Sequence, residues 1–140
     1  MRSNAPILLV EDDRVDVMTV QRALRDIKIT NPVRVAGNGE EALTILRDDE
    51  ERRPCLILLD LRMPRMGGIE FLRVVKKDES LKRIPVVVLT TSREERDRVE
   101  SFELGVAGYM VKPVHYEGFM EIIRTIDLYW TLSHLPPECE

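Results

Sequence analysis

The sequence predicts an α/β domain in which a mainly parallel sheet is covered by helices on both faces. Short apolar runs alternate along the chain with segments whose apolar residues recur every three or four positions, as on one face of a helix. The apolar runs are continuous, which is typical of strands buried on both sides. The 140 residues fit one domain of ordinary size, and we expect about five strands alternating with about five helices.

Two pairs of strand and helix are expected in the first part of the chain. Residues 7–10 (ILLV) predict the first strand, and the inner face of the helix after it is expected to hold Val15, Met18, Leu24 and Ile27. Residues 33–35 predict the second strand. Asn38-Gly39 ends this strand before a helix whose expected inner face is Ala42, Leu43, Ile45 and Leu46.

Three further pairs follow. Strands are predicted at residues 56–59 (LILL), 84–89 (IPVVVL) and 109–111. The helix after the first of these is expected to bury Ile69, Phe71, Leu72 and Val75. Ser92 and Glu95 have the spacing of a capping box, so the next helix is expected to begin there and to end at Gly105. Its expected inner face is Val99, Phe102 and Leu104, and that of the last helix is Phe119, Ile122, Ile123 and Ile126.

The composition disfavours several classes of function. The 21 Lys and Arg against 25 Asp and Glu give a net charge of −4, which argues against nucleic acid or an anionic membrane as the main partner. No apolar run approaches the roughly 20 residues that span a bilayer, and the first residues do not resemble a secretion signal, so we expect a cytoplasmic protein. Cys55 and Cys139 are too few for a disulfide framework or a four-ligand zinc site.

Polar side chains follow the predicted strands. Glu11, Asp12 and Asp13 come after the first strand and Asp60 comes after the third. In open α/β sheets the functional crevice lies beyond the carboxyl ends of the strands. If these two strands are neighbours, Glu11, Asp12 and Asp60 repel one another in one partly enclosed site, and a hard divalent cation such as Mg²⁺ or Mn²⁺ relieves that repulsion.

The fourth and fifth strands end in residues that suit phosphoryl chemistry. Thr90, Thr91 and Ser92 follow one strand, and Lys112 with Pro113 follows the other. A metal-bound carboxylate beside a lysine and a threonine hydroxyl can position a phosphoryl group and neutralise its charge. Asp60 would then be the nucleophile that forms an acyl phosphate.

Four motifs at these strand ends resemble the receiver domain of two-component response regulators, the CheY-like family. They are VEDD at 10–13, LLDLRMPRMGG at 58–68, VVLTTS at 87–92 and GYMVKP at 108–113. The match extends over nearly the whole chain. It implies a doubly wound, flavodoxin-like five-stranded parallel sheet with strand order 2-1-3-4-5. We therefore expect a single receiver domain over residues 1–140, with 128–140 as an extension of the last helix and a tail.

The resemblance also implies a role for each site residue. Asp60 resembles the phosphoacceptor, and Glu11 and Asp12 match the acidic pair that holds Mg²⁺ together with Asp60 and the backbone carbonyl of Arg62. Lys112 is expected to pair with a phosphoryl oxygen, and Thr91 to offer its backbone N–H. Thr90 matches the hydroxyl that follows the phosphoryl group, and Tyr109 matches the aromatic switch. Asp13 is expected only to begin the first helix.

Three local features accompany the resemblance. Glu11 stands where many relatives have Asp. The Arg62 side chain is expected near the site of attacking water, where it either shields the acyl phosphate or positions the water. The bond between Lys112 and Pro113 is expected to be cis, as in the family.

The sequence predicts a signalling switch that assists its own phosphorylation and dephosphorylation and is not a metabolic enzyme. The expected partners are a sensor histidine kinase and a downstream protein. Tyr129, Trp130, Leu132 and Leu135 either fold back on the domain or enlarge a homodimer face formed by the fourth helix, fifth strand and last helix. The run IDLYWTLSHLP also resembles stand-alone receivers that accompany bacterial phytochrome-type kinases.

Three other functions are weaker alternatives. A metal-dependent aspartyl phosphatase of the dehalogenase type usually needs a second acid two residues after the nucleophile, where this chain has Arg62. A flavodoxin-like mononucleotide binder would need a first loop that attracts phosphate, and Glu11, Asp12 and Asp13 repel it. A degenerate receiver would bind partners without phosphorylation, which the presence of Asp60, Thr90 and Lys112 disfavours.

Overall fold

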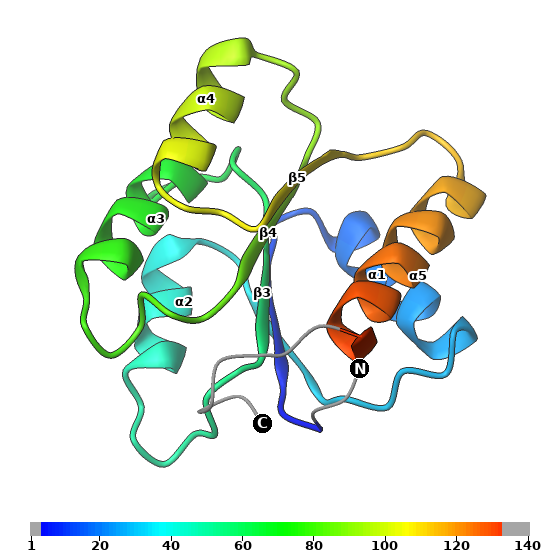
Figure 1. Ribbon diagram of the computed structural model, residues 1–140, viewed down its shortest axis with the longest axis horizontal. Helices are drawn as coiled ribbons and strands as arrows, with labels where there is room; N and C mark the ends of the chain where they lie inside the picture. The colour runs from blue at the N-terminus through cyan, green and yellow to red at the C-terminus, as the bar shows by residue number, and fades with distance from the viewer. Residues whose placement is uncertain (1–3, 133–140) are drawn as a thin grey trace.

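The computed structural model describes residues 4–132, in which strands and helices alternate from end to end. The elements are β1 (Ile7–Val10), α1 (Arg14–Asp26), β2 (Val33–Ala36), α2 (Gly39–Leu46), β3 (Leu56–Leu59), α3 (Gly68–Lys77), β4 (Val86–Thr90), α4 (Glu95–Glu103), β5 (Gly108–Val111) and α5 (Tyr116–Leu132). The strands form one parallel sheet in the order β2-β1-β3-β4-β5. Helices α1 and α5 cover one face, and α2, α3 and α4 cover the other (Figure 1). The predicted doubly wound α/β fold is confirmed.

The sheet separates two apolar cores. Alternate side chains of the central strands point to opposite faces, so that Leu9 and Leu58 pack toward α1 and α5 while Val10 and Leu59 pack toward α2 and α3. All the residues of β1, β3 and β4 are buried. The edge strands β2 and β5 are only partly buried. Continuous apolar runs therefore mark the central strands, as expected.

Helix α1 begins at a side-chain cap, and half of its predicted inner face is confirmed: Leu24 is buried and Ile27 packs against the core. The Asp13 carboxylate accepts hydrogen bonds from the backbone N–H groups of Val15 and Asp16, which confirms its role at the helix start. The expectation that Val15 and Met18 point inward is wrong, because they are 70% and 64% exposed. At about 3.6 residues per turn, they lie on the opposite side of α1 from the buried Val20 and its neighbours.

Helix α4 corrects two further expectations. The capping box is wrong: the helix begins at Glu95 without a side-chain cap, and Ser92 lies before it, donating from Oγ to Asp97 at 2.7 Å. Val99 and Phe102 do not point inward and are about half exposed, because the buried residues of α4 are the polar Asp97 and Ser101. The helix does end where predicted, just before a glycine. Gly105 has a φ angle of 87°, which residues other than glycine rarely adopt.

The last helix, α5, packs on the sheet through Phe119, Ile123, Ile126 and Trp130. Trp130 thus folds back on its own domain, whereas Tyr129 and Leu132 are exposed. Leu135 and Cys139 lie outside the described residues, and Cys55 is fully buried in the core. Among residues 4–132, no helix is both long and apolar enough to cross a membrane.

The peptide bond between Lys112 and Pro113 is trans, because residues 4–132 contain no cis peptide bond. The expectation of a cis bond is therefore wrong. It came from the resemblance alone, while the local preference of a proline peptide bond favours trans by about 0.5–1 kcal/mol.

Candidate functional site

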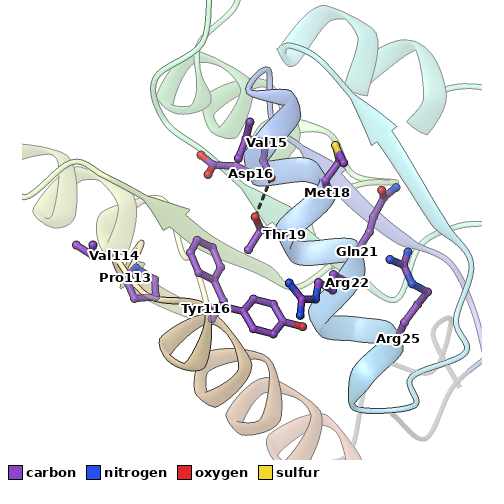
Figure 2. A pocket seen from close by; sticks show the side chains of 11 residues that line it. Val15, Asp16, Met18, Thr19, Gln21, Arg22, Arg25, Pro113, Val114 and Tyr116 are labelled. Atoms are coloured by element: carbon purple, nitrogen blue, oxygen red, sulfur yellow. Dashed lines mark hydrogen bonds between the residues drawn. The ribbon is translucent and has the colours of Figure 1, made fainter.

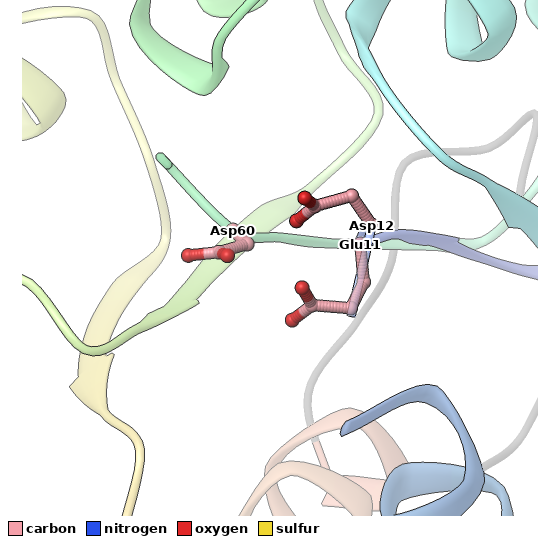
Figure 3. Close-up of side chains that lie close together, drawn as sticks. All are labelled: Glu11, Asp12 and Asp60. Carbon is pink, nitrogen blue, oxygen red and sulfur yellow. The ribbon is translucent and has the colours of Figure 1, made fainter. Parts of the chain in front are cut away.

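Three carboxylates meet where β1 and β3 end. These strands are paired, with Val10 opposite Leu59, so the residues that follow them emerge at the same edge of the sheet. Glu11, Asp12 and Asp60 each offer an oxygen, and the three oxygens lie within 4.8 Å of one another (Figure 3). Glu11 and Asp60 are buried, and Asp12 is exposed. A cluster of carboxylate oxygens that opens to solvent on one side suits a hard divalent cation such as Mg²⁺ or Mn²⁺.

The backbone around Asp60 is held tightly. The N–H of Asp60 donates to the Val10 carbonyl at 3.0 Å, and the N–H of Gly68 donates to the Leu61 carbonyl at 3.1 Å. A Cβ atom on Gly68 would lie only 2.6 Å from the Asp60 carbonyl oxygen. A glycine at the start of α3 therefore lets this helix approach the end of β3, which fixes the loop that carries Asp60 and Arg62.

Lys112 provides the positive charge of the site. Its backbone N–H donates to the Thr90 carbonyl at 2.8 Å, which places the residue at the carboxyl end of β5. Its Nζ lies 2.5 Å from Glu11 Oε1, 2.8 Å from Asp16 Oδ2 and 3.3 Å from Asp60 Oδ2. The Lys112 side chain is only 6% exposed, so these contacts lie in a poorly hydrated environment where charge interactions are strong.

The cluster holds more carboxylate groups than ammonium groups, and the pKa values of Glu11 and Lys112 are both raised. Burial is the main reason that the pKa of Glu11 is raised to about 7; the hydrogen bond from Lys112 lowers it, and the nearby Asp60 raises it. Burial also acts to lower the pKa of Lys112, but its contacts with Asp16, Glu11 and Asp60 outweigh that effect and raise it above its ordinary value. One ammonium group thus faces several carboxylates, which a bound cation would stabilise.

Thr90 and Tyr109 are linked through the segment between β4 and α4. Thr90 is fully buried at the end of β4, and its Oγ1 accepts from the backbone N–H of Ser92 at 3.3 Å. The Tyr109 hydroxyl donates to the Ser92 carbonyl at 3.0 Å. Thr91, which lies between Thr90 and Ser92, is exposed. Both predicted switch residues therefore contact the same short segment.

The Arg62 side chain extends to helix α4. One of its guanidinium nitrogens, Nη2, lies 3.0 Å from Glu94 Oε1 and 2.6 Å from Asp97 Oδ2. The backbone N–H of Arg62 faces Asp60 Oδ1 at 3.5 Å. Arg62 therefore connects the loop after Asp60 with the start of α4.

Two parts of this network were missing from the sequence prediction. Asp16 contacts Lys112, and its place in the first turn of the helix that directly follows Glu11 and Asp12 could have indicated that it lies near the same site. Asp97 binds both Arg62 and Ser92. No local signal separates Asp97 from the other acids of α4, because its burial depends on the tertiary fold.

Residues 7–124 match the family model described as the response regulator receiver domain. The chain belongs to this family. Response regulator Rcp1 from Synechocystis is 40% identical to this receiver over 134 residues, which cover 91% of each chain. The family is one of signalling proteins that pair with sensor histidine kinases.

Solved structures agree with this assignment. The Mn²⁺-bound form of Rcp1 matches with a TM-score of 0.86 and 38% identity, covering 94% of this chain and 98% of that one. The phosphorylated cyanobacterial phytochrome response regulator RcpA matches with a TM-score of 0.85 and 38% identity, covering 94% and 97%. These neighbours confirm both the CheY-like fold and the narrower resemblance of this receiver to phytochrome response regulators.

Proposed function

We propose that this receiver accepts a phosphoryl group from a sensor histidine kinase on Asp60, in a reaction that requires Mg²⁺ or Mn²⁺. The observation that supports this most strongly is the arrangement of Glu11, Asp12 and Asp60 within 4.8 Å, beside a buried lysine. Glu11, Asp12, Asp60 and the backbone carbonyl of Arg62 would hold the ion. When bound, the ion neutralises charge on the carboxylates and on the phosphoryl oxygens.

Each residue of the site has a separate role in the transfer step. A carboxylate oxygen of Asp60 forms a bond to the phosphorus of the phosphohistidine, the phosphorus–nitrogen bond breaks, and its electron pair stays on the imidazole, which takes up a proton from solvent. Lys112 donates hydrogen bonds to a phosphoryl oxygen, and the Thr91 backbone N–H offers another donor. Catalysis then consists of positioning and charge stabilisation, which is the usual requirement of phosphoryl transfer.

Phosphorylation signals through the segment between β4 and α4. The Thr90 hydroxyl, now bonded to the Ser92 N–H, would turn to the phosphoryl group. That movement disturbs the Ser92 backbone, to which Tyr109 also bonds. The result is a shift in a two-state equilibrium of the surface around α4, which a downstream protein reads.

An exposed apolar surface beside the site is suited to the kinase. It lies between α1 and the segment that leads into α5, and Figure 2 shows its side chains. Val15 and Met18 on α1 are more than half exposed, and Val114 is 93% exposed. A phosphohistidine has to reach a buried Asp60, so we place the phosphohistidine-bearing part of a phytochrome-type kinase on this surface. Met18→Asp should slow transfer from that kinase much more than transfer from a small acyl phosphate.

We also propose that the last part of α5 contributes to a homodimer with α4 and β5, and that 128–140 extends a single receiver domain. Thr125, Leu128, Tyr129 and Leu132 line a shallow apolar groove. Because a second copy would present the same groove, the surface can be self-complementary. Replacing Leu128 and Leu132 together by Ser should convert a dimer to a monomer in light scattering. A monomeric mass for the unaltered protein would contradict the dimer, and a double variant that stays dimeric would contradict this interface.

The function is tested with a small acyl phosphate and Mg²⁺. We expect the protein to gain the mass of one phosphoryl group, to lose the gain when EDTA removes the ion, and to show no gain as Asp60→Asn. If the protein and its Asp60→Asn variant behave alike, it is a degenerate receiver that binds partners without phosphorylation. Steady release of phosphate from many esters would instead indicate a phosphatase.

A further inference from the structure

Lys112 has one carboxylate partner that belongs to neither the phosphoacceptor nor the expected metal ligands. An ammonium group carries three N–H donors, and in this structure they face Glu11, Asp16 and Asp60. Asp60 is the most distant of the three, at 3.3 Å, while Asp16 is at 2.8 Å. The lysine is thus held mainly from the α1 side of the site.

The partners of Lys112 differ in what the reaction demands of them. Phosphorylation changes Asp60 from a carboxylate into an acyl phosphate, and a bound cation would be coordinated by both Glu11 and Asp60. Asp16 is neither phosphorylated nor an expected ligand of the cation. Because its contact with Lys112 needs no change during the cycle, Asp16 can keep the ammonium group in place while the charges of the other two partners change.

The position of Asp16 is well supported by the fold. It lies in the first turn of α1, where its backbone N–H donates to the Asp13 cap at 3.2 Å. Helix α1 is anchored on the sheet by Val20, Ala23 and Leu24. The Asp16 side chain is 25% exposed and faces a lysine that is 6% exposed. A partly buried carboxylate on a rigid helix loses little entropy when it binds an ammonium group.

We infer that Asp16 is a positioning residue for phosphoryl transfer, which holds the Lys112 ammonium group toward Asp60. This inference rests on the proposed function. In the reaction with a small acyl phosphate, an Asp60 oxygen bonds to phosphorus, the bond from phosphorus to the acyl oxygen breaks, and the carboxylate product leaves with the electron pair. Asp16 contacts none of these atoms and acts only through Lys112.

The test compares two substitutions that each remove one negative charge from the start of α1. Asp16→Asn removes the charged partner of Lys112. Asp13→Asn is the matched control, because asparagine is also a good helix cap and Asp13 does not contact Lys112. At saturating Mg²⁺ and acyl phosphate, we expect Asp16→Asn to slow phosphorylation by about tenfold, the smaller end of the effect of losing a supporting partner. Asp13→Asn should change the rate by less than about twofold.

A double-mutant cycle shows whether the effect passes through the lysine. When Lys112→Ala is already present, adding Asp16→Asn should cause no further loss, because the group that Asp16 positions is missing. A second readout does not depend on phosphorylation. With ¹⁵N-labelled lysine, the metal-free protein should show an ammonium signal for Lys112 that Asp16→Asn shifts or broadens and that Asp13→Asn leaves unchanged.

The outcomes separate the inference from the function on which it rests. Equal rates for Asp16→Asn and Asp13→Asn, in a protein that is phosphorylated on Asp60, would overturn the role of Asp16 alone. A further loss in the Lys112→Ala background would do the same. Failure of the unaltered protein to become phosphorylated would overturn both.

Discussion

Helices α4 and α5 lie on opposite faces of the sheet, and they are held in different ways (Figure 1). Helix α5 buries the large apolar side chains of Phe119, Ile123, Ile126 and Trp130. The residues that α4 buries are Asp97 and Ser101. Burial of an apolar side chain contributes about 1.5–3 kcal/mol. The core thus fixes α5 firmly and contributes little to fixing α4.

Polar contacts hold α4 in place of apolar packing. Asp97 accepts from Ser92 Oγ at 2.7 Å and pairs with Arg62. An ion pair also joins Arg73 to Glu100. Exposed ion pairs contribute only about 0–1 kcal/mol each. Helix α4, beside the proposed switch, therefore depends on contacts that can be exchanged at small cost, while α5 provides a fixed support.

The same substitution in the two helices tests this difference most strongly. Phe119 on α5 is 6% exposed and Phe102 on α4 is 51% exposed. Phe119→Ala should lower the free energy of unfolding by about 3–5 kcal/mol because it leaves a cavity in the core. Phe102→Ala should lower it by less than about 0.5 kcal/mol. Urea denaturation measures both values, and similar losses of unfolding free energy would mean that the core holds α4 as firmly as α5.

Removing the polar anchor of α4 should have a smaller and local effect. Asp97→Ala leaves the buried Ser92 hydroxyl without its acceptor, which costs about 1–2 kcal/mol. We expect hydrogen exchange of the α4 amides to accelerate by about tenfold, while the amides of α5 keep their rates. The exposed Glu95→Ala in the same helix is the control. Equal acceleration in both helices would mean that α4 and α5 open together.

The contact from Arg62 should have the smallest effect. Its side chain is half exposed, so the pair with Asp97 should contribute about 0.5 kcal/mol after screening by solvent. Arg62→Ala should accelerate exchange of the first α4 amides at low salt, and the difference should shrink at high salt. The half-exposed Arg124, which pairs within α5, provides the control as Arg124→Ala. An effect that does not depend on salt would argue against an electrostatic link between the β3 loop and α4.

The sequence predicts the parts of this structure that follow local rules. Continuous apolar runs identify β1, β3 and β4 because these strands are buried on both faces. Glu11 and Asp60 could be placed at the same edge of the sheet because each directly follows one of these strands. That β1 and β3 are neighbours came from the family resemblance, since no local pattern determines strand order.

Other features depend on the tertiary fold and could not be predicted in this way. The face of α4 was misassigned because the rule that apolar residues point inward fails for a helix that buries Asp97 and Ser101. In α1, Val15 and Met18 were misassigned because helical spacing does not distinguish a core face from an exposed apolar surface. The contact between Asp16 and Lys112 joins residues far apart in the sequence, so it became visible only in the fold.

Hydrogen exchange with and without phosphorylation shows whether the switch acts on α4 and leaves α5 fixed. The protein is treated with acyl phosphate and Mg²⁺, and the exchange of each helix is compared with that of the Asp60→Asn variant under the same conditions. We predict that phosphorylation changes exchange in the segment 91–94 and in α4, and that it leaves α5 unchanged. Phosphorylation of Asp60 with no change in α4, or with an equal change in α5, would rule out a switch that is confined to the α4 side of the sheet.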